Sequence, residues 1–127
     1  LMQHSEENGG VPCIGLFAGK VKRFDDHAVD ASGAVLKVPH MGWNRVRQSK
    51  PHAMWRDIDN NGHFYFVHSY FVAPDAPSEI VGEADYPTPF CAAIAHKNVF
   101  AVQFHPEKSQ RNGLQLLQNF LTWNGQA

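Results

Sequence analysis

The chain has 127 residues, of which 43% are hydrophobic and 18% charged, and its formal net charge is −1. These values are typical of one globular domain. With 11 basic and 12 acidic residues, the chain lacks the positive charge by which proteins hold nucleic acid or an anionic membrane surface. No apolar run is long enough to cross a bilayer, so we expect neither a nucleic-acid nor a membrane partner.

The first third of the chain predicts short elements separated by turns. The opening residues, LMQHSEENGG, are typical of the end of a helix that stops at Gly9-Gly10. A domain rarely starts in the second half of a helix, so we expect these residues to continue a larger domain. Residues 14–24 predict one or two strands, and residues 25–33 predict a polar loop.

Strand patterns dominate the middle of the chain, where β-branched and aromatic residues are common. Residues 34–46 are expected to start as a strand and to break at Pro39 and Gly42. Residues 51–62 are expected to form a short helical turn. Further strands are expected at 63–74, 78–86, 90–98 and 99–104, with turns at 87–89 and 97–98.

One long helix is expected at residues 110–123, because apolar residues recur there at three- and four-residue spacing. Its apolar face consists of Leu114, Leu117, Phe120 and Leu121. Ser109 can cap its start, and Gly125 lies just past its end. The sequence therefore predicts a strand-rich α/β domain with one long C-terminal helix.

A histidine and a glutamate follow directly after a strand in NVFAVQFHPEKS, residues 98–109. Pro106 keeps His105 away from helical angles, and side chains two apart in an extended chain point the same way. We therefore expect Glu107 to orient the imidazole of His105, as in the base half of a nucleophilic triad. On spacing alone, a solvated pair at a strand-end turn is the simpler interpretation.

The two cysteines lack the surroundings of a catalytic nucleophile. Cys13 stands in VPCIG, without the small residues that a nucleophile elbow needs on both sides, and Cys91 stands in PFCAAIA, which is typical of a buried strand. Two distant thiols form no disulfide framework, which favours a reducing, cytoplasmic compartment. No two of the eight histidines have H-x-H or H-x-x-x-H spacing, so we expect no metal and no other cofactor.

Three motifs occur together along the chain: VPHMGWN, FYFVHSY and QFHPEKS. With SEENGG, GLFAGKVKRF and GLQLLQNFL, they resemble the class I (triad-type) glutamine amidotransferases, and PHMGWN with YFVHSY resembles the glutaminase subunits of imidazole glycerol phosphate synthase. The resemblance covers nearly the whole chain and implies a flavodoxin-like α/β fold. The family usually has proline where Ala18 stands, which puts nothing catalytic in doubt.

The resemblance implies that the nucleophile lies outside these residues. The family has a Gly-x-Cys-x-Gly elbow just before the stretch that matches LMQHSEENGG, and an oxyanion-forming glycine strand further upstream. Residues 1–127 would then be the C-terminal portion of a type 1 glutamine amidotransferase domain. That portion alone would be inactive.

The resemblance also implies a reaction and a role for nine residues. Glutamine and water would give glutamate and ammonia through a thioester, with His105 as general base and Glu107 as its orienting group. Residues implied to hold the glutamine are His68, Ser69 and Tyr70. A (β/α)₈ cyclase barrel would form a heterodimer with the subunit and use the ammonia to make imidazole glycerol phosphate and AICAR in histidine biosynthesis. Residues implied to face it are Trp43, Asn44, Tyr65 and Lys108.

Trp43 can also be interpreted from its neighbours. It stands between Gly42 and Asn44 after a Pro-His-Met break, which predicts a loop position, and an aromatic residue on a loop is a plausible interface anchor. A core tryptophan is the alternative.

Two other functions remain open at this point. One is a glutaminase domain of another class I amidotransferase, such as one for nucleotide or anthranilate synthesis, against which PHMGWN argues. The other is a non-catalytic interaction module with the same fold. The missing elbow cysteine suits such a module, whereas intact His105 and Glu107 argue against it.

Overall fold

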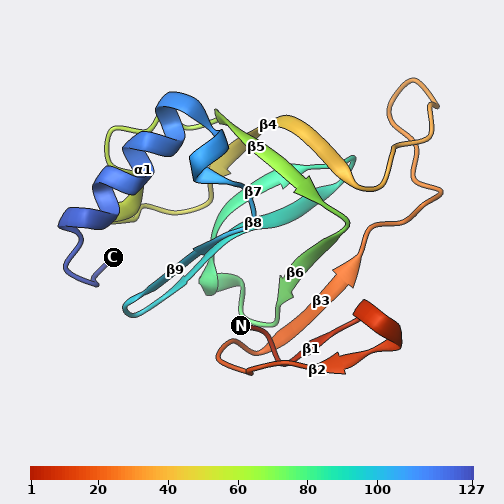
Figure 1. The fold of residues 1–127 in the computed structure, drawn as a ribbon, viewed down its shortest axis with the longest axis horizontal. Coiled ribbons are helices and arrows are strands. Elements are labelled where there is room, and N and C mark those ends of the chain that lie inside the picture. The colour runs from red at the N-terminus through yellow and green to blue at the C-terminus, as the bar shows by residue number, and fades with distance from the viewer.

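The computed structural model describes residues 1–127 and consists mainly of strands, with one α-helix at one end of the molecule (Figure 1). Nine strands join in one sheet in the order β2-β1-β3-β6-β8-β7-β4-β5, and β9 pairs with β8 beside this path. The strands are β1 His4–Ser5, β2 Val11–Pro12, β3 Gly19–Arg23, β4 His40–Gln48, β5 Gly62–His68, β6 Tyr70–Pro74, β7 Ile80–Asp85, β8 Pro89–His96 and β9 Val99–Val102. All pairs are antiparallel except β1 with β3.

The helical elements are short apart from the last one. The 3-10 turns are η1 Glu7–Gly9, η2 Ala53–Trp55, η3 Pro77–Glu79 and η4 Pro106–Lys108, and the α-helix is α1 Gln110–Thr122. The predicted C-terminal helix is therefore confirmed to within one residue, as is the strand-rich α/β architecture. The predicted hairpin turn at residues 97–98 is also confirmed, between β8 and β9. No helix is long and apolar enough to cross a membrane.

Two sequence predictions about local structure are wrong. Residues 1–10 form a short strand and a 3-10 turn, not the end of a helix. Asn8, Gly9 and Gly10 have positive φ angles of 52°, 77° and 107°, and this reversal lets β1 pair with β2. Residues 34–39 contain no strand, and β4 begins immediately after Pro39 and runs through Gly42, which pairs with Phe66. Pairing with β5 thus overrides the expected break.

Two other expectations need adjustment. Residues 63–74 are two strands, β5 and β6, with Ser69 between them. The expected apolar face of α1 is largely exposed, with Leu121 at 83%, and Gly113, Leu116 and Asn119 are buried instead. The Asn119 amide donates to the carbonyl oxygens of Met54 and Arg56 at 2.9 and 2.7 Å, so this polar anchor sets which side of α1 packs on η2.

An aromatic core lies between the sheet and α1 and supports the segment that follows β9. The Phe64 and Phe104 rings lie 4.1 Å apart, and Phe66 is fully buried beside them. Burying such a side chain stabilises the fold by roughly 1.5–3 kcal/mol. Residue 104 is thereby fixed immediately before His105.

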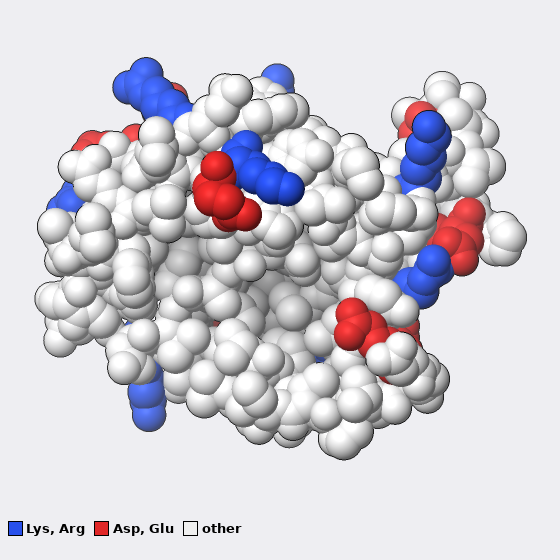
Figure 2. Space-filling model, viewed as in Figure 1, with Lys and Arg blue, Asp and Glu red and all other residues white.

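Charged side chains are spread over the surface rather than gathered together. Figure 2 shows Lys and Arg at separate points around one face, with Asp and Glu between them and an uncharged hollow at its centre. A surface that holds nucleic acid is typically a continuous basic stripe. This face has no such stripe.

Candidate functional site

His105 and Glu107 meet directly downstream of β9. His105 Nδ1 lies 2.9 Å from Glu107 Oε1, so the predicted contact is confirmed. The local geometry differs from the expected extended chain, because Glu107 lies in the 3-10 turn η4, which turns its side chain back to the imidazole. With Nδ1 bound to the carboxylate, Nε2 is the ring nitrogen left to exchange a proton with a neighbouring group.

Glu107 is held in its ionised form. Its own backbone N–H, followed by His105 and Lys108, lowers the pKa of the Glu107 carboxyl below its usual range. An ionised carboxylate accepts a hydrogen bond from Nδ1–H and stabilises the ring when Nε2 also carries a proton. The pair can therefore act as a base with a fixed tautomer.

The backbone of His105 is fixed by the neighbouring strand β5 and by Ser109. The His105 N–H donates to the Tyr65 carbonyl oxygen at 3.0 Å. The Ser109 hydroxyl donates to the His105 carbonyl oxygen at 2.6 Å and accepts from the Tyr65 N–H at 3.0 Å. Ser109 stands at the start of α1, but its side chain does not cap the helix as expected. Ser109 therefore positions the backbone of His105, although its place before the helix predicted a helix cap.

Gly113 allows α1 to pack closely against η4. A Cβ atom at position 113 would lie 1.8 Å from the Pro106 carbonyl oxygen and 2.7 Å from its carbon. Both atoms belong to backbone, so no side-chain rotation can relieve the clash. The turn that carries Glu107 therefore depends on a glycine in the facing helix.

Replacing Gly113 by alanine is expected to destabilise the protein, although the same change in an open helix interior stabilises by roughly 0.5–1 kcal/mol. Overpacking typically costs about 1–3 kcal/mol, and relief of this clash must move η4. The unfolding midpoint in urea measures the effect, with Gln118→Ala at an exposed position of α1 as the control. An unchanged or raised midpoint for Gly113→Ala would contradict the close approach.

Three of the four residues predicted to face a partner form one surface group, here called the Trp43 patch: Trp43, Tyr65 and Lys108. Trp43 and Tyr65 pair across β4 and β5, with their rings edge to face at 5.9 Å, and Lys108 Nζ lies 5.8 Å from the Tyr65 ring centre. Trp43 lies inside a strand, not on the predicted loop, and its exposed fraction of 47% shows that it is not a core residue.

Asn44, the fourth of these residues, points to the other side of β4. Its Nδ2 lies 3.3 Å from His40 Nε2 and donates to the Asp85 carbonyl oxygen at 2.9 Å. The structure therefore does not bring Asn44 into the Trp43 patch.

His68, Ser69 and Tyr70 connect β5 to β6 beside the same region. His68 is the last residue of β5 and is buried, with Nδ1 2.8 Å from the Tyr70 carbonyl oxygen. Burial lowers the pKa of His68, and the charge of His105 adds to this effect. Ser69 accepts from the Phe24 N–H at 3.0 Å. This segment is thus held by hydrogen bonds from the Phe24 backbone and from the His68 ring.

Neither cysteine takes part in the His105 site. Cys91 is buried in β8, and burial raises the pKa of its thiol to about 12, so it is protonated at neutral pH. Cys13 is exposed just after β2, and its thiol contacts the Val11 carbonyl oxygen at 3.7 Å. The structure thus agrees with the sequence-based expectation that Cys91 is a buried thiol.

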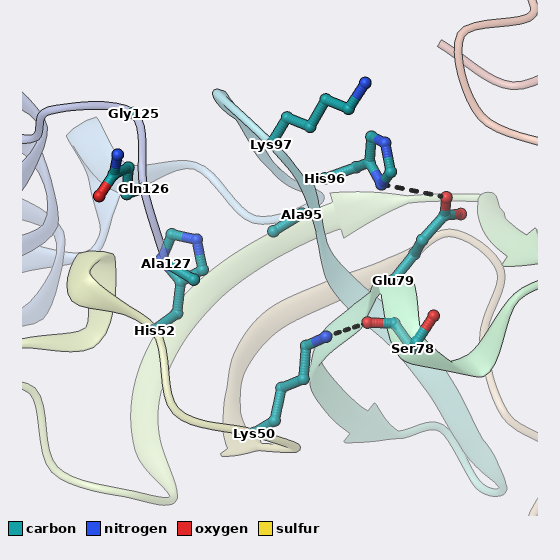
Figure 3. A pocket seen from close by; sticks show the side chains of 10 residues that line it. All are labelled: Lys50, His52, Ser78, Glu79, Ala95, His96, Lys97, Gly125, Gln126 and Ala127. Atoms are coloured by element: carbon teal, nitrogen blue, oxygen red, sulfur yellow. Dashed lines mark hydrogen bonds and ion pairs between the residues drawn. The ribbon is translucent and has the colours of Figure 1, made fainter.

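A separate cavity of about 520 Å³ lies next to the C-terminal residues (Figure 3). Its lining includes Lys50, His52, Glu79 and His96, with His96 Nδ1 3.8 Å from Glu79 Oε1. None of the nine predicted site residues lines it. No group of three or more His, Cys, Asp or Glu side chains is arranged to hold a metal ion.

Comparison with known proteins shows the family to which the chain belongs. Residues 10–123 match the family model of the class I glutamine amidotransferases. The chain is 56% identical over 124 residues to imidazole glycerol phosphate synthase subunit HisH of Methylococcus capsulatus, covering 97% of this chain and 57% of that protein. It is 54% identical over 125 residues to the HisH subunit of Pseudomonas putida, covering 98% of this chain and 58% of that protein.

A further HisH subunit, from Nitrosococcus oceani, is 56% identical over 125 residues, and the match covers 98% of this chain and 57% of that protein. The chain therefore spans somewhat more than half the length of the relatives it matches. The family model covers most of the chain, including the segment that carries His105 and Glu107. The chain belongs to the class I glutamine amidotransferase family.

Proposed function

We propose that residues 1–127 are the C-terminal portion of a type 1 glutamine amidotransferase domain, in the glutaminase subunit of an imidazole glycerol phosphate synthase. The observation that carries this proposal is the 2.9 Å contact between His105 Nδ1 and Glu107 Oε1. It leaves Nε2 free to act as a base. The identity of 56% to HisH subunits supports the choice of pathway.

The intact subunit hydrolyses glutamine to glutamate and ammonia. Its nucleophile is a cysteine in the part of the subunit that these residues do not include. His105 Nε2 takes the thiol proton, the thiolate attacks the side-chain amide of glutamine, and the same proton passes to the departing ammonia. Water then opens the thioester with His105 again as base, which gives glutamate and restores the thiol. Glu107 keeps Nδ1 protonated and stabilises the imidazolium.

The substrate lies against the β5–β6 connection. The backbone of Ser69 and Tyr70 holds the glutamine. His68 stabilises this segment through its hydrogen bond to the Tyr70 carbonyl oxygen. No metal or other cofactor takes part in this mechanism.

The partner is a (β/α)₈ cyclase barrel, which forms a heterodimer with the subunit in the cytoplasm. The Trp43 patch faces this barrel, whereas Asn44 on the other side of β4 is bound to His40 and Asp85 and does not form part of that surface. Ammonia passes from the glutaminase site to the barrel, where it is used to make imidazole glycerol phosphate and AICAR in histidine biosynthesis. Lys108 follows Glu107 directly and contacts the Tyr65 ring, so this member of the patch adjoins the catalytic pair.

The test is glutamate release by the intact subunit with and without the cyclase. We expect turnover only when the partner is present, and a covalent γ-glutamyl adduct on the subunit when reacting samples are acid-quenched and weighed by mass spectrometry. Residues 1–127 alone are the control and should release no glutamate. An intact subunit that forms no adduct and no glutamate, while the cyclase still works with free ammonia, would instead favour a non-catalytic module.

A further inference from the structure

Two buried histidines form a direct hydrogen bond in the interior, away from solvent. His40 on β4 and His68 on β5 are only 4% and 8% exposed, and His40 Nδ1 lies 2.9 Å from His68 Nε2. Their surroundings are aromatic: the Tyr86 ring stacks on His40 at 4.1 Å, and Phe24 lies 5.1 Å from His68. Buried polar groups are costly unless every hydrogen bond is made, so this pair calls for a complete set of partners.

The partners fix one tautomer for each ring. The Tyr70 carbonyl oxygen can only accept, so His68 Nδ1 must donate to it, at 2.8 Å. His68 Nε2 is then an acceptor, and His40 Nδ1 must donate to it.

The series of hydrogen bonds formed by Tyr70, His68 and His40 continues to Asn44. His40 Nε2 is left as an acceptor and receives the Asn44 amide at 3.3 Å. The Asn44 amide also donates to the Asp85 carbonyl oxygen, and Asn44 Oδ1 accepts from the Arg45 N–H at 2.8 Å. These last two bonds prevent a flip of the Asn44 amide. Hydrogen bonds therefore run in one direction from Asn44 through both rings to Tyr70.

Protonation of either ring would break this series, because an added N–H would face another donor. Burial opposes it and lowers the pKa of His40 to about 4. The ionisable side chain that stacks on His40 is Tyr86, and the charge of His105 acts on His68. The carboxylate of Asp85 is paired with Arg47 at 2.9 Å.

The position of the series gives it a role. It begins at Asn44, the neighbour of Trp43 in β4, and ends at the Tyr70 carbonyl oxygen, directly after Ser69. We propose that His40 and His68, in these fixed tautomers, are positioning residues that set the orientation of the Ser69–Tyr70 backbone for glutamine. The assignment of the substrate rests on the proposed function. The tautomers and their effect on Tyr70 do not.

The first arm of the test is nitrogen-15 NMR on residues 1–127 and on the intact subunit. We expect His40 and His68 to be neutral with hydrogen on Nδ1 at pH 7, and His40 to stay neutral at pH 5. An Nε2–H tautomer or a cationic ring at pH 7 would overturn the series.

The second arm uses two substitutions at position 40. His40→Phe keeps the aromatic shape and removes the hydrogen bonds, whereas the side-chain amide of His40→Asn can still donate near the place of Nδ1. The Tyr70 carbonyl carbon shift should move in His40→Phe and return toward the unmodified value in His40→Asn. In the intact enzyme, KM for glutamine should rise about tenfold in His40→Phe with a smaller change in kcat, and recover in His40→Asn.

The outcomes separate the two levels of the proposal. Unchanged Tyr70 shift and unchanged KM in a folded His40→Phe protein would overturn the positioning role. If both variants had a lower melting temperature and asparagine restored neither the Tyr70 shift nor KM, the cause would be a general fold defect. That result would also overturn the positioning role. If the intact subunit has no glutaminase activity, the proposed function fails, while the tautomers and the Tyr70 shift still decide the structural part.

Discussion

Replacing His105 by alanine in the intact subunit is expected to reduce glutamine turnover by roughly 10³-fold or more, as removal of the base from a nucleophilic triad does. Without the imidazole, no group next to Glu107 can take the thiol proton or return it to the leaving ammonia. The structure places no other ionisable side chain in hydrogen-bond contact with Glu107 Oε1. The loss therefore affects both formation and hydrolysis of the thioester.

Glu107→Gln is expected to leave more activity than His105→Ala. The amide oxygen of glutamine can still accept from His105 Nδ1, so the tautomer survives, but the negative charge that stabilises the imidazolium is gone. Steady-state glutamate release with the cyclase present measures both variants. His27→Ala, at a histidine on the loop between β3 and β4, is the matched control and should keep full activity.

The ammonia-fed synthase reaction distinguishes catalysis from structure in this series. It bypasses the glutaminase site, so it should be unchanged in His105→Ala and in Glu107→Gln. A parallel loss of that reaction in His105→Ala would show that the residue supports the fold or the partner contact, and the role as a base would then be wrong.

The features that sequence could predict are the local ones. The contact between His105 and Glu107 spans two residues, and α1 follows from an apolar repeat within 13 residues. The predicted break of the strand at Gly42 is wrong. Seven residues of β4 pair with β5, and this pairing outweighs the tendency of glycine to interrupt a strand. The same pairing places Trp43 opposite Tyr65, which no local pattern around Trp43 can reveal.

The features that sequence could not predict depend on distant partners. His40 and His68 lie 28 residues apart, and Ser109 contacts Tyr65 across 44 residues. In both cases a polar side chain has a common local explanation, a satisfied core histidine or a helix cap, and only the fold shows its true partner. The apolar face of α1 illustrates the same limit, because periodicity identifies a face but not what it packs against.

Replacing Trp43 by alanine is expected to weaken binding of the intact subunit to the cyclase at least about tenfold, which corresponds to roughly 1.4 kcal/mol. Trp43 is half exposed and already held edge to face on Tyr65, so it offers a rigid apolar surface that loses little entropy on binding. Such aromatic anchors often cost about 2 kcal/mol or more when truncated. Titration calorimetry measures Kd, with Val35→Ala, an exposed apolar position on the loop before β4, as the control.

Lys108→Ala is expected to weaken binding less, because an exposed charge mainly affects association rate and salt dependence. Its larger effect should be on coupling between the two activities. Lys108 lies over the Tyr65 ring, the backbone of Tyr65 binds the His105 N–H, and Trp43 packs on the same ring. A partner that contacts the Trp43 patch therefore contacts the strand β5 that holds the backbone of His105. Removing Lys108 should raise the ratio of glutamate released to cyclase product formed. If Trp43→Ala instead left Kd unchanged and lowered the melting temperature, Trp43 would belong to the fold of the subunit and this route from partner to base would be lost.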